Sequence, residues 1–139
     1  MNSRTTLVED CKLFKLPKIR NRSGNITPIQ NLIDIPFEVK RIYYLYDVPS
    51  GATRGGHAHK DLQQLIVAGS GSFDVNLSDG KQEKKVTLNT PDVGLLMPKG
   101  IWRDLSNFSS GSICLVLASH LYSEEDYIRS FDDFLNYKK

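Results

Sequence analysis

The sequence predicts an all-β domain, either a sandwich or a small barrel, with a short helical segment at its C-terminal end. Short runs rich in β-branched and aromatic residues recur along most of the chain, and Gly, Pro, Asn and Asp separate them, as in strands joined by tight turns. Apolar residues at helical spacing are confined to the C-terminal end. The length of 139 residues fits a single domain, residues 1–139.

The predicted strands follow one another at close spacing. The first is residues 39–48, where β-branched and aromatic residues are concentrated. A hairpin turn is expected at 78–81, because its central Asp-Gly pair is the dipeptide best suited to positive φ. The other predicted strands are 64–68, 73–77, 85–88, 94–97, 101–105 and 113–118. Six or more short strands at this spacing are typical of a sandwich or small barrel.

The C-terminal segment has a different pattern. Ser123 is followed by three acidic residues, which is typical of a capped helix with acids in its first turn. Apolar residues then recur at helical spacing, at Tyr127, Phe131, Phe134 and Leu135. We therefore expect a short helix or two to cover one end of the barrel.

Charge and hydropathy exclude several classes of partner. Lys and Arg number 18 and Asp and Glu number 16, so the net charge is +2, without the basic excess of a nucleic-acid binder. A small anionic ligand needs only a local cluster of cations and remains possible. No apolar run approaches the roughly 18 residues of a membrane span, and the N-terminal residues contain no apolar signal core. We expect a cytoplasmic protein that binds neither nucleic acid nor membrane.

The two cysteines support the same compartment. Cys11 and Cys114 lie far apart and form no CxxC pair. They are expected to be buried thiols of a reducing compartment rather than a disulfide or a zinc site.

The histidine pair His57-Ala58-His59 is the first candidate for chemistry. Alternate side chains of a strand share one face, so both imidazoles point the same way. The preceding residues 54–56, Arg-Gly-Gly, let the backbone bend as it enters this strand. An HxH pair alone is a weak signal, since a single histidine is more often structural. His120, which follows a predicted strand, is expected to be such a histidine.

Two segments resemble the motifs of the cupin family. The first has a glycine, an HxH pair, a position that is usually acidic, and a second glycine; it matches Gly51, His57, His59, Gln64 and Gly71. The second has a PxG turn, a position that is usually histidine, and an asparagine; it matches 98–100, Arg103 and Asn107. Two separate matches with the right internal spacing imply a cupin jelly-roll barrel.

The departures from these motifs predict that no metal is bound. In a metal cupin the two HxH histidines, the acid of the first motif and the histidine of the second hold the ion. Here Gln64 is a poor ligand, and Arg103 is a permanent cation that would repel a divalent ion. We expect no metal and no other cofactor. Two imidazoles, an arginine and an amide instead suit proton transfer on an anionic substrate.

Further candidates come from the first strand and the loop after it. Alternation places Val39, Arg41, Tyr43 and Leu45 on one face of the strand. Tyr43 is the candidate functional tyrosine because Arg41 lies beside it on that face; ordinary aromatic packing is the alternative interpretation. Arg54 is interpreted either as a diphosphate ligand or as a solvated loop cation.

At family level the sequence resembles the nucleotide-sugar 3,4-ketoisomerases of bacterial deoxysugar pathways. The resemblance runs from about Gly24 to Tyr137 and is carried by 35–48, 54–67, 79–102 and 115–134. The RGxHAHK and DYIR stretches are more specific than the cupin spacings. These enzymes are small cupins that act on dTDP-4-keto-6-deoxy-D-glucose. The resemblance implies a metal-free homodimer with exchanged N-terminal strands, in a pathway where an aminotransferase next makes a 3-amino-3,6-dideoxy sugar for a cell-surface glycan.

The resemblance also assigns roles to residues. It implies that His57 is the catalytic base with His59 beside it, that Tyr43 is the active-site tyrosine, and that Arg54 binds phosphate. We expect Arg41 and Gln64 to contact the substrate as well. Arginine at position 103, where some similar proteins have histidine, favours a 3-keto product of gluco rather than galacto configuration. The loop 21–23 varies among similar proteins and matches no product type.

The predicted reaction moves a ketone from C4 to C3. A base removes the C3 proton, which is acidic because it is α to a ketone, and an enediol(ate) is reprotonated at C4. An imidazole has a suitable unperturbed pKa. Three alternatives remain open: a metal cupin such as a dioxygenase, a sugar-nucleotide-binding cupin without turnover, and an enzyme like the related nucleotide-sugar 3,5-epimerases.

Overall fold

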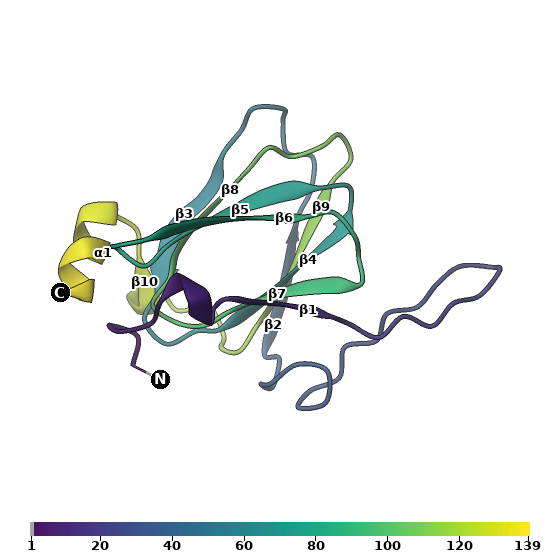
Figure 1. Cartoon of the computed structure of the whole chain (residues 1–139), viewed down its shortest axis with the longest axis horizontal. Helices are drawn as coiled ribbons and strands as arrows, with labels where there is room; N and C mark the ends of the chain where they lie inside the picture. Colours follow the sequence, from purple (N-terminus) through teal and green to yellow (C-terminus); the bar gives the residue numbers. More distant parts are fainter. Residues whose placement is uncertain (1) are drawn as a thin grey trace.

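The chain folds into two antiparallel β-sheets that face each other, as the computed structural model of residues 2–139 shows (Figure 1). The strand order is β1-β7-β4-β9-β2 in one sheet and β10-β3-β8-β5-β6 in the other. The first sheet consists of Lys12–Lys15 (β1), Arg41–Leu45 (β2), Gln64–Ser70 (β4), Val93–Met97 (β7) and Ile113–Ala118 (β9). The second consists of Arg54–His59 (β3), Phe73–Ser78 (β5), Glu83–Leu88 (β6), Trp102–Ser106 (β8) and Tyr127–Ile128 (β10).

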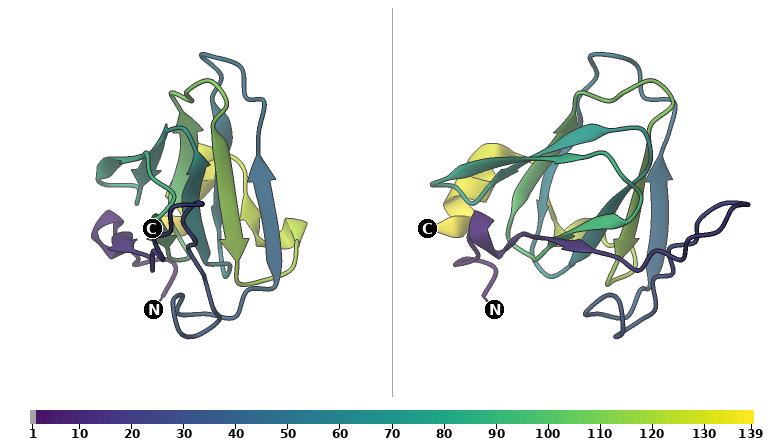
Figure 2. Two further views of the ribbon diagram at one scale, coloured as in Figure 1. Left: turned by 90° about the vertical axis from the view of Figure 1, so that its right-hand side faces the viewer. Right: turned by 45° about the vertical axis from the view of Figure 1, so that its right-hand side comes forward.

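The topology of the eight central strands is that of a jelly roll. Without the outer strands β1 and β10, the two sheets read β2-β9-β4-β7 and β3-β8-β5-β6. Successive strands alternate between the two layers, except that β5 and β6 form a hairpin within one layer. Figure 2 shows the two layers from the side, with the interior between them. The predicted all-β jelly roll is therefore confirmed.

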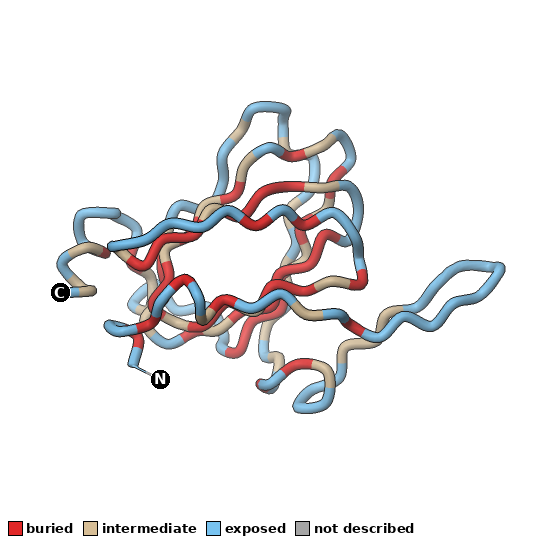
Figure 3. The backbone as a smooth tube through the Cα atoms, viewed as in Figure 1, coloured by how far each residue is buried: buried red, intermediate tan, exposed pale blue. Residues whose placement is uncertain are grey.

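The core lies between the two sheets, where the buried stretches of Figure 3 face inward. Alternation along the strands accounts for it, because every second side chain points inside. In β2, Arg41, Tyr43 and Leu45 are partly buried, whereas Ile42 and Tyr44 are exposed. The predicted alternation of this strand is confirmed, and the face that carries Tyr43 is the inner one. The apolar core between the sheets includes Phe73, Val75, Leu77, Leu88, Leu95, Met97 and Ile101. A second buried cluster includes Phe37, Leu65, Val67 and Leu117.

The prediction for the C-terminal segment is wrong in one part. Residues Glu124–Asp126 form a single 3₁₀ turn (η2) rather than the start of an α-helix, and Tyr127 lies in β10, paired with His59 of β3. The reason is a set of long-range hydrogen bonds. The Asp126 carboxylate accepts hydrogen bonds from the backbone N–H groups of Asp61 and Leu62. The backbone carbonyl of Asp126 accepts one from the N–H of Lys60. These bonds draw the segment against β3.

The predicted helix begins later and does cover one end of the barrel (Figure 1). It is Phe131–Lys138 (α1), and the side chain of its N-cap Ser130 accepts a hydrogen bond from the N–H of Asp133. Phe134 is fully buried. The Lys138 ammonium donates to three backbone carbonyls, those of Ser3, Thr6 and Gly100, each at 2.8 Å. These contacts join α1 to the N-terminal segment, which includes the short 3₁₀ turn Val8–Asp10 (η1).

An arm made of residues 17–31 extends away from the barrel (Figure 1). Ile19 and Ile26 pair across it by backbone hydrogen bonds, and both side chains are exposed. β1, by contrast, pairs with β7 of the same chain. The projecting part of the N-terminal region is therefore the arm and not β1.

Two smaller expectations are tested by the same structure. Cys11 and Cys114 are both free and buried, as predicted, and burial raises the pKa of each thiol. No helix within residues 2–139 has the length and apolar character needed to cross a membrane.

Candidate active site

A cavity of about 190 Å³ opens between the two sheets, and its polar lining comes from several elements. We call it the inner pocket. β2, β3, β4, β8 and β10 each contribute at least one polar side chain. The polar lining residues are Arg41, Tyr43, Arg54, His57, Gln64, Arg103, Tyr127 and Arg129. The structure thus brings six of the seven predicted site residues to one cavity, and the exception is His59.

The two histidines of β3 differ in their access to the inner pocket. His57 lines the pocket, whereas His59 is fully buried behind it. Their Nε2 atoms lie 3.1 Å apart, at hydrogen-bonding distance. On its far side, His59 Nδ1 lies 2.9 Å from Oδ2 of Asp126. The predicted proximity of the pair is correct, but only His57 is placed to touch a substrate.

The surroundings of His57 favour its neutral form. Burial lowers the pKa of His57 to about 2, and the Arg103 cation is the next largest cause. Arg103 lies directly opposite His57 in the register of β3 and β8. Burial and Arg103 also lower the pKa of His59, while the Asp126 carboxylate acts in the opposite direction. Both imidazoles are therefore unprotonated at neutral pH, as a general base requires.

Arg103, Gln64 and Tyr43 form a chain of hydrogen bonds along one wall of the inner pocket. Arg103 Nη1 donates to Oε1 of Gln64 at 2.6 Å, and Nε2 of Gln64 donates to the hydroxyl oxygen of Tyr43 at 3.0 Å. The amide is therefore oriented by the guanidinium. Because the Tyr43 oxygen accepts this bond, its own O–H remains free to donate to a bound molecule.

Both ends of this chain are suited to an anionic intermediate. Burial raises the pKa of Tyr43, so the phenol keeps its proton. Burial lowers the pKa of Arg103 to about 10, which still leaves the guanidinium charged at neutral pH. Apart from Gln64, the acceptor of Arg103 within residues 2–139 is the carbonyl of Ile101. A buried cation held by neutral groups favours negative charge that develops nearby.

Three arginines lie at the inner pocket, in addition to Arg103. Nη1 of Arg41 is buried and has no hydrogen-bond partner within residues 2–139, while its guanidinium lies over the rings of Tyr43 and Tyr122. Arg54 is exposed at the start of β3. Arg129 makes a double hydrogen bond to Glu124 at 2.6 and 2.8 Å. The unpartnered donor of Arg41 and the free cation of Arg54 suit a doubly charged ligand such as a diphosphate.

Three residues of the site were missed by sequence reasoning: Asp126, Tyr127 and Arg129. Asp126 contacts His59. The ring of Tyr127 lies 5.1 Å from that of His57 and 4.4 Å from that of His59, between centroids, and Arg129 lies over the same ring at 4.1 Å. All three belong to the DYIR stretch that carried the family resemblance. The resemblance of this stretch to the family was the signal that could have identified these residues. Because the stretch was expected to be helical, its pairing with β3 was not predicted.

The arrangement does not fit a divalent metal ion. Gln64 and Arg103, at two positions where a metal cupin has ligands, are hydrogen-bonded to each other. Across residues 2–139 no three His, Cys, Asp or Glu side chains are grouped so as to hold an ion. The permanent charge of Arg103 would repel a cation. The expectation of a metal-free enzyme is consistent with this geometry and stays a prediction.

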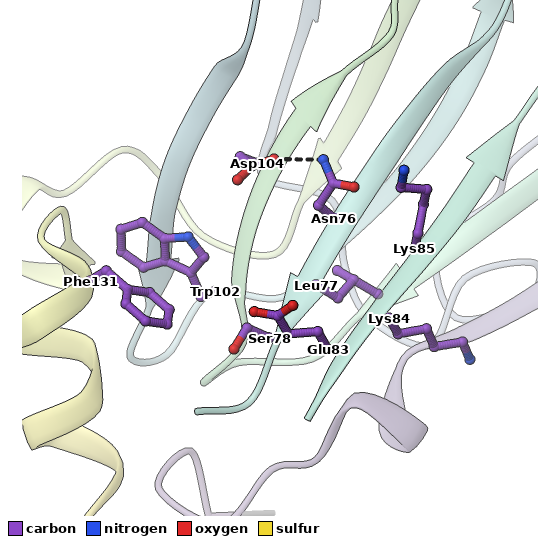
Figure 4. Close-up of a pocket in the computed structure, with 9 residues that line it drawn as sticks. All are labelled: Asn76, Leu77, Ser78, Glu83, Lys84, Lys85, Trp102, Asp104 and Phe131. Atoms are coloured by element: carbon purple, nitrogen blue, oxygen red, sulfur yellow. Dashed lines mark hydrogen bonds between the residues drawn. The ribbon is translucent and has the colours of Figure 1, made fainter. Parts of the chain in front are cut away.

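A larger groove lies on the outer face of β5, β6 and β8 (Figure 4). Its volume is about 510 Å³, and Trp102 and Phe131 form its aromatic edge. Asn76 donates to Asp104 on its floor at 2.7 Å. It contains no histidine among its lining residues. His120 is also outside the inner pocket, exposed and bonded to Ser119, as expected for a surface histidine. Acid–base chemistry is therefore assigned to the inner pocket.

Comparisons with known proteins agree with this geometry. Residues 9–139 match the protein family described as FdtA: WxcM-like, C-terminal. Over 126 residues the chain is 40% identical to a TDP-4-oxo-6-deoxy-alpha-D-glucose-3,4-oxoisomerase from Aneurinibacillus thermoaerophilus, and the match covers 91% of each protein.

Solved structures give the same result. QdtA, a sugar 3,4-ketoisomerase from Thermoanaerobacterium thermosaccharolyticum in complex with TDP, is 40% identical, with a TM-score of 0.91 over 94% of this chain and 95% of QdtA. WlaRB, a TDP-quinovose 3,4-ketoisomerase from Campylobacter jejuni, is 44% identical, with a TM-score of 0.88 over 93% of this chain and 99% of WlaRB.

The family match spans nearly the whole chain and includes every residue of the inner pocket. The identity to the oxoisomerase extends over nine tenths of both sequences. The chain therefore belongs to the FdtA, WxcM-like C-terminal family of sugar 3,4-ketoisomerases.

Proposed function

We propose that this protein is a dTDP-4-keto-6-deoxy-D-glucose 3,4-ketoisomerase. The observation that carries the proposal is a neutral, half-buried His57 directly opposite the buried cation of Arg103, with the Tyr43 hydroxyl in the same cavity. A base and two groups that stabilise an oxyanion are what an enolisation requires. Relatives of 40% and 44% identity with the corresponding names support this substrate class.

The first step is the removal of the C3 proton. His57 takes this proton, and the electron pair of the C3–H bond forms a C3=C4 double bond while the C4 carbonyl becomes an enolate oxygen. The O–H of Tyr43 and the Arg103 guanidinium stabilise the negative charge on that oxygen. Donors fixed in a dry cavity each contribute about 3 kcal/mol to such a step.

In the second step the carbonyl group forms at C3 and C4 is protonated. The hydroxyl proton on O3 is lost and O4 gains one, so that O3 becomes the new enolate oxygen. Its electron pair forms the C3 carbonyl, and C4 takes a proton. Tyr43 is the group best suited to the oxygen-to-oxygen transfer, because burial keeps it protonated and Gln64 orients it. The atoms of substrate and product are the same.

The nucleotide is held outside the enclosed part of the pocket. Arg41 and Arg54 bind the diphosphate, because charge-assisted bonds from arginine fix both position and orientation. The unpartnered Nη1 of Arg41 supports this role. Gln64 lines the same pocket, where it accepts a hydrogen bond from Arg103 and donates one to the Tyr43 hydroxyl, and so orients that hydroxyl toward the sugar.

The product is assigned the gluco configuration at C4. The C3 proton of the substrate and the C4 proton of a gluco product lie on opposite faces of the ring, so the gluco product requires that C4 is protonated from the face opposite to His57. Arg103 cannot deliver a proton, whereas a histidine at position 103 would lie beside His57 and could protonate C4 from the same face as His57, which gives the galacto product. The name of the Campylobacter relative, a TDP-quinovose ketoisomerase, supports the gluco assignment, since quinovose is 6-deoxyglucose.

The protein is proposed to act as a homodimer in the cytoplasm. The arm 17–31 extends from the barrel and exposes Ile19 and Ile26, and Leu32 and Ile33 directly after it are exposed as well. Exposed apolar groups of this kind mark interaction surfaces. The strand exchange that the resemblance implies is assigned to this arm, because β1 already pairs with β7. Sedimentation of the purified protein at the mass of one chain would contradict the dimer.

A turnover assay distinguishes the proposal from its alternatives. Purified protein is incubated with dTDP-4-keto-6-deoxyglucose, and the unstable product is trapped by a 3-aminotransferase, the class of enzyme that consumes a 3-keto sugar. A 3-amino-3,6-dideoxy sugar is expected, with full activity after chelation. Binding without turnover would favour a non-catalytic cupin, and activity that depends on a stoichiometric metal would favour a metal cupin.

A further inference from the structure

The buried His59 has a carboxylate partner that lies outside the inner pocket. Oδ2 of Asp126 lies 2.9 Å from Nδ1 of His59, and Nε2 of the same imidazole lies 3.1 Å from Nε2 of His57. Asp126 itself does not line the pocket. The three side chains therefore form one continuous chain, with the carboxylate at the protein end and His57 at the substrate end.

The carboxylate determines where the protons of this chain lie. An ionised carboxylate only accepts, so Nδ1 of His59 carries the proton in this contact. Neutral His59 then has its lone pair on Nε2 and accepts from Nε2–H of His57. This leaves the lone pair of neutral His57 on Nδ1, the nitrogen that is not used within the chain. One carboxylate thus selects the tautomer of both histidines.

Asp126 also supplies the negative charge that the histidines need once a proton is taken up. The cations that surround the pair are Arg103 from β8, Arg41 from β2 and Arg129 after β10, and all of them disfavour an imidazolium, whereas the backbone of Gly55 favours it on His57. The neighbouring phenols are those of Tyr43 and Tyr127. Within residues 2–139, Asp126 is the carboxylate in contact with the histidine pair. It is held in place by backbone N–H groups of Asp61 and Leu62, at 2.7 and 3.3 Å.

We propose that Asp126 is a positioning residue for the ketoisomerase reaction, which fixes the tautomers of His59 and His57 and compensates the charge of the proton that His57 takes from C3. When Nδ1 of His57 gains that proton, its Nε2 proton can pass to His59, where Asp126 stabilises the imidazolium. After C4 is protonated, the reverse movement returns a proton to Nε2 of His57, and Nδ1 releases the proton taken from C3, so that both histidines are neutral again. The inference rests on the proposed function for its kinetic part, and on the hydrogen bonds alone for its tautomer part.

The tautomer part is tested by NMR on wild-type protein with ¹⁵N-labelled histidine at neutral pH. The expected spectrum has His59 protonated on Nδ1 and not on Nε2, and His57 protonated on Nε2 and not on Nδ1. In Asp126→Asn, the amide keeps its oxygen toward Asp61 and presents N–H to His59, so both tautomers are expected to reverse. This readout is independent of any substrate.

The kinetic part is tested with the same variant and a matched control. Asp126→Asn is expected to lower kcat roughly 10²-fold, within the range for a misoriented base, with KM changed less than threefold because Asp126 does not touch the pocket. Loss of the carboxylate destabilises the imidazolium, so the acid-side pKa of the kcat/KM profile is expected to fall. Glu125→Gln removes the neighbouring exposed carboxylate and is expected to change neither quantity.

Several outcomes would overturn the inference. A wild-type spectrum with His59 protonated on Nε2 would contradict the tautomer assignment, whatever the activity. A folded Asp126→Asn variant with more than a third of wild-type kcat and an unchanged pH profile would show that Asp126 only ties β10 to the 61–62 turn. If that variant does not fold, Asp126→Glu, which retains the charge, is expected to keep the wild-type tautomers. Wild-type protein without turnover but with the expected tautomers would refute the proposed function and leave the hydrogen-bond part standing.

Discussion

His57 and Arg103 lie opposite each other on neighbouring strands. Burial is the main cause that lowers the pKa of the His57 imidazole, and the Arg103 cation lowers it further, so the base is unprotonated at neutral pH. The same cation stabilises the enediolate that forms when the base has acted. A single cross-strand contact therefore favours the beginning and the intermediate of the reaction.

Replacement of His57 by Asn is expected to remove the base while leaving nucleotide binding intact. Loss of a general base typically costs about 10²–10⁴-fold in rate. Turnover measured in the coupled assay should fall within this range, whereas the affinity for dTDP measured by calorimetry should stay unchanged. His120→Asn, an exposed histidine outside the pocket, is the control and should keep full activity. A His57→Asn variant with more than a tenth of the wild-type rate would assign the base to another residue, His59 first.

Replacement of Tyr43 by Phe is expected to reduce kcat without reducing stability. The change keeps the ring, which packs against the core and under Arg41, and removes only the hydroxyl that Gln64 orients. Loss of one oxyanion donor costs about 10²–10³-fold in kcat. Steady-state kinetics and thermal unfolding measure the two effects separately. An unchanged kcat would assign Tyr43 to packing.

Replacement of Arg103 by His is expected to raise the fraction of galacto product. The imidazole would lie beside His57 in the same sheet and could protonate C4 from the face that loses the C3 proton, which the guanidinium cannot do and which gives the galacto configuration. The trapped 3-amino sugars are compared by NMR for their configuration at C4. A galacto product from the wild-type protein would show that Arg103 does not determine the face, and would direct attention to loop 21–23 at the tip of the arm.

Among the elements, β10 is one that sequence patterns could not predict, in contrast to the longer strands. The long strands and the 78–81 turn were predicted because alternation and turn residues act locally. β10 has two residues, too few for any period, and it forms because Asp126 bonds to backbone groups 64 and 65 positions away. The acids after Ser123 resemble a helix start, but tertiary hydrogen bonds overrode that local preference.

The helix α1 is expected to hold β10 in place, and Phe134 is its anchor. Phe134 is fully buried and packs with Ala58 of β3 and Ile128 of β10. Truncation of a buried phenylalanine costs about 3–5 kcal/mol, so Phe134→Ala should lower the free energy of urea unfolding by that amount. Phe131→Ala, at a residue 39% exposed, should cost far less. Equal losses in the two variants would contradict the anchoring role.

At the scale of the whole molecule, the jelly roll explains why distant motifs meet. The HxH pair and the PxG turn lie on β3 and before β8, which are neighbours in one sheet, and β2 and β4 complete the cavity from the other sheet. Six of the seven predicted residues therefore line one pocket. The position of His59 behind His57, and the whole contribution of residues 126–129, required the three-dimensional pairing of β10 with β3.

The overall architecture also leaves one part of the molecule outside the barrel. The arm 17–31 carries the variable loop 21–23 at its tip, away from the inner pocket of its own chain. In the proposed dimer this loop is the part of one chain best placed to reach the other. The family resemblance indicated that the loop varies among similar proteins, but not that it projects.

Incubation with dTDP-4-keto-6-deoxyglucose in deuterated water, followed by NMR, tests the central claim most directly. Proton transfer between C3 and C4 through an enediolate predicts a new 3-keto sugar with deuterium at C4, and deuterium at C3 only in 4-keto substrate that is re-formed by the reverse reaction. His57→Asn should abolish both changes. The C5 proton should remain, because no step of the mechanism touches it. An unchanged spectrum, or deuterium at C5 as a 3,5-epimerase would introduce, would contradict the assignment.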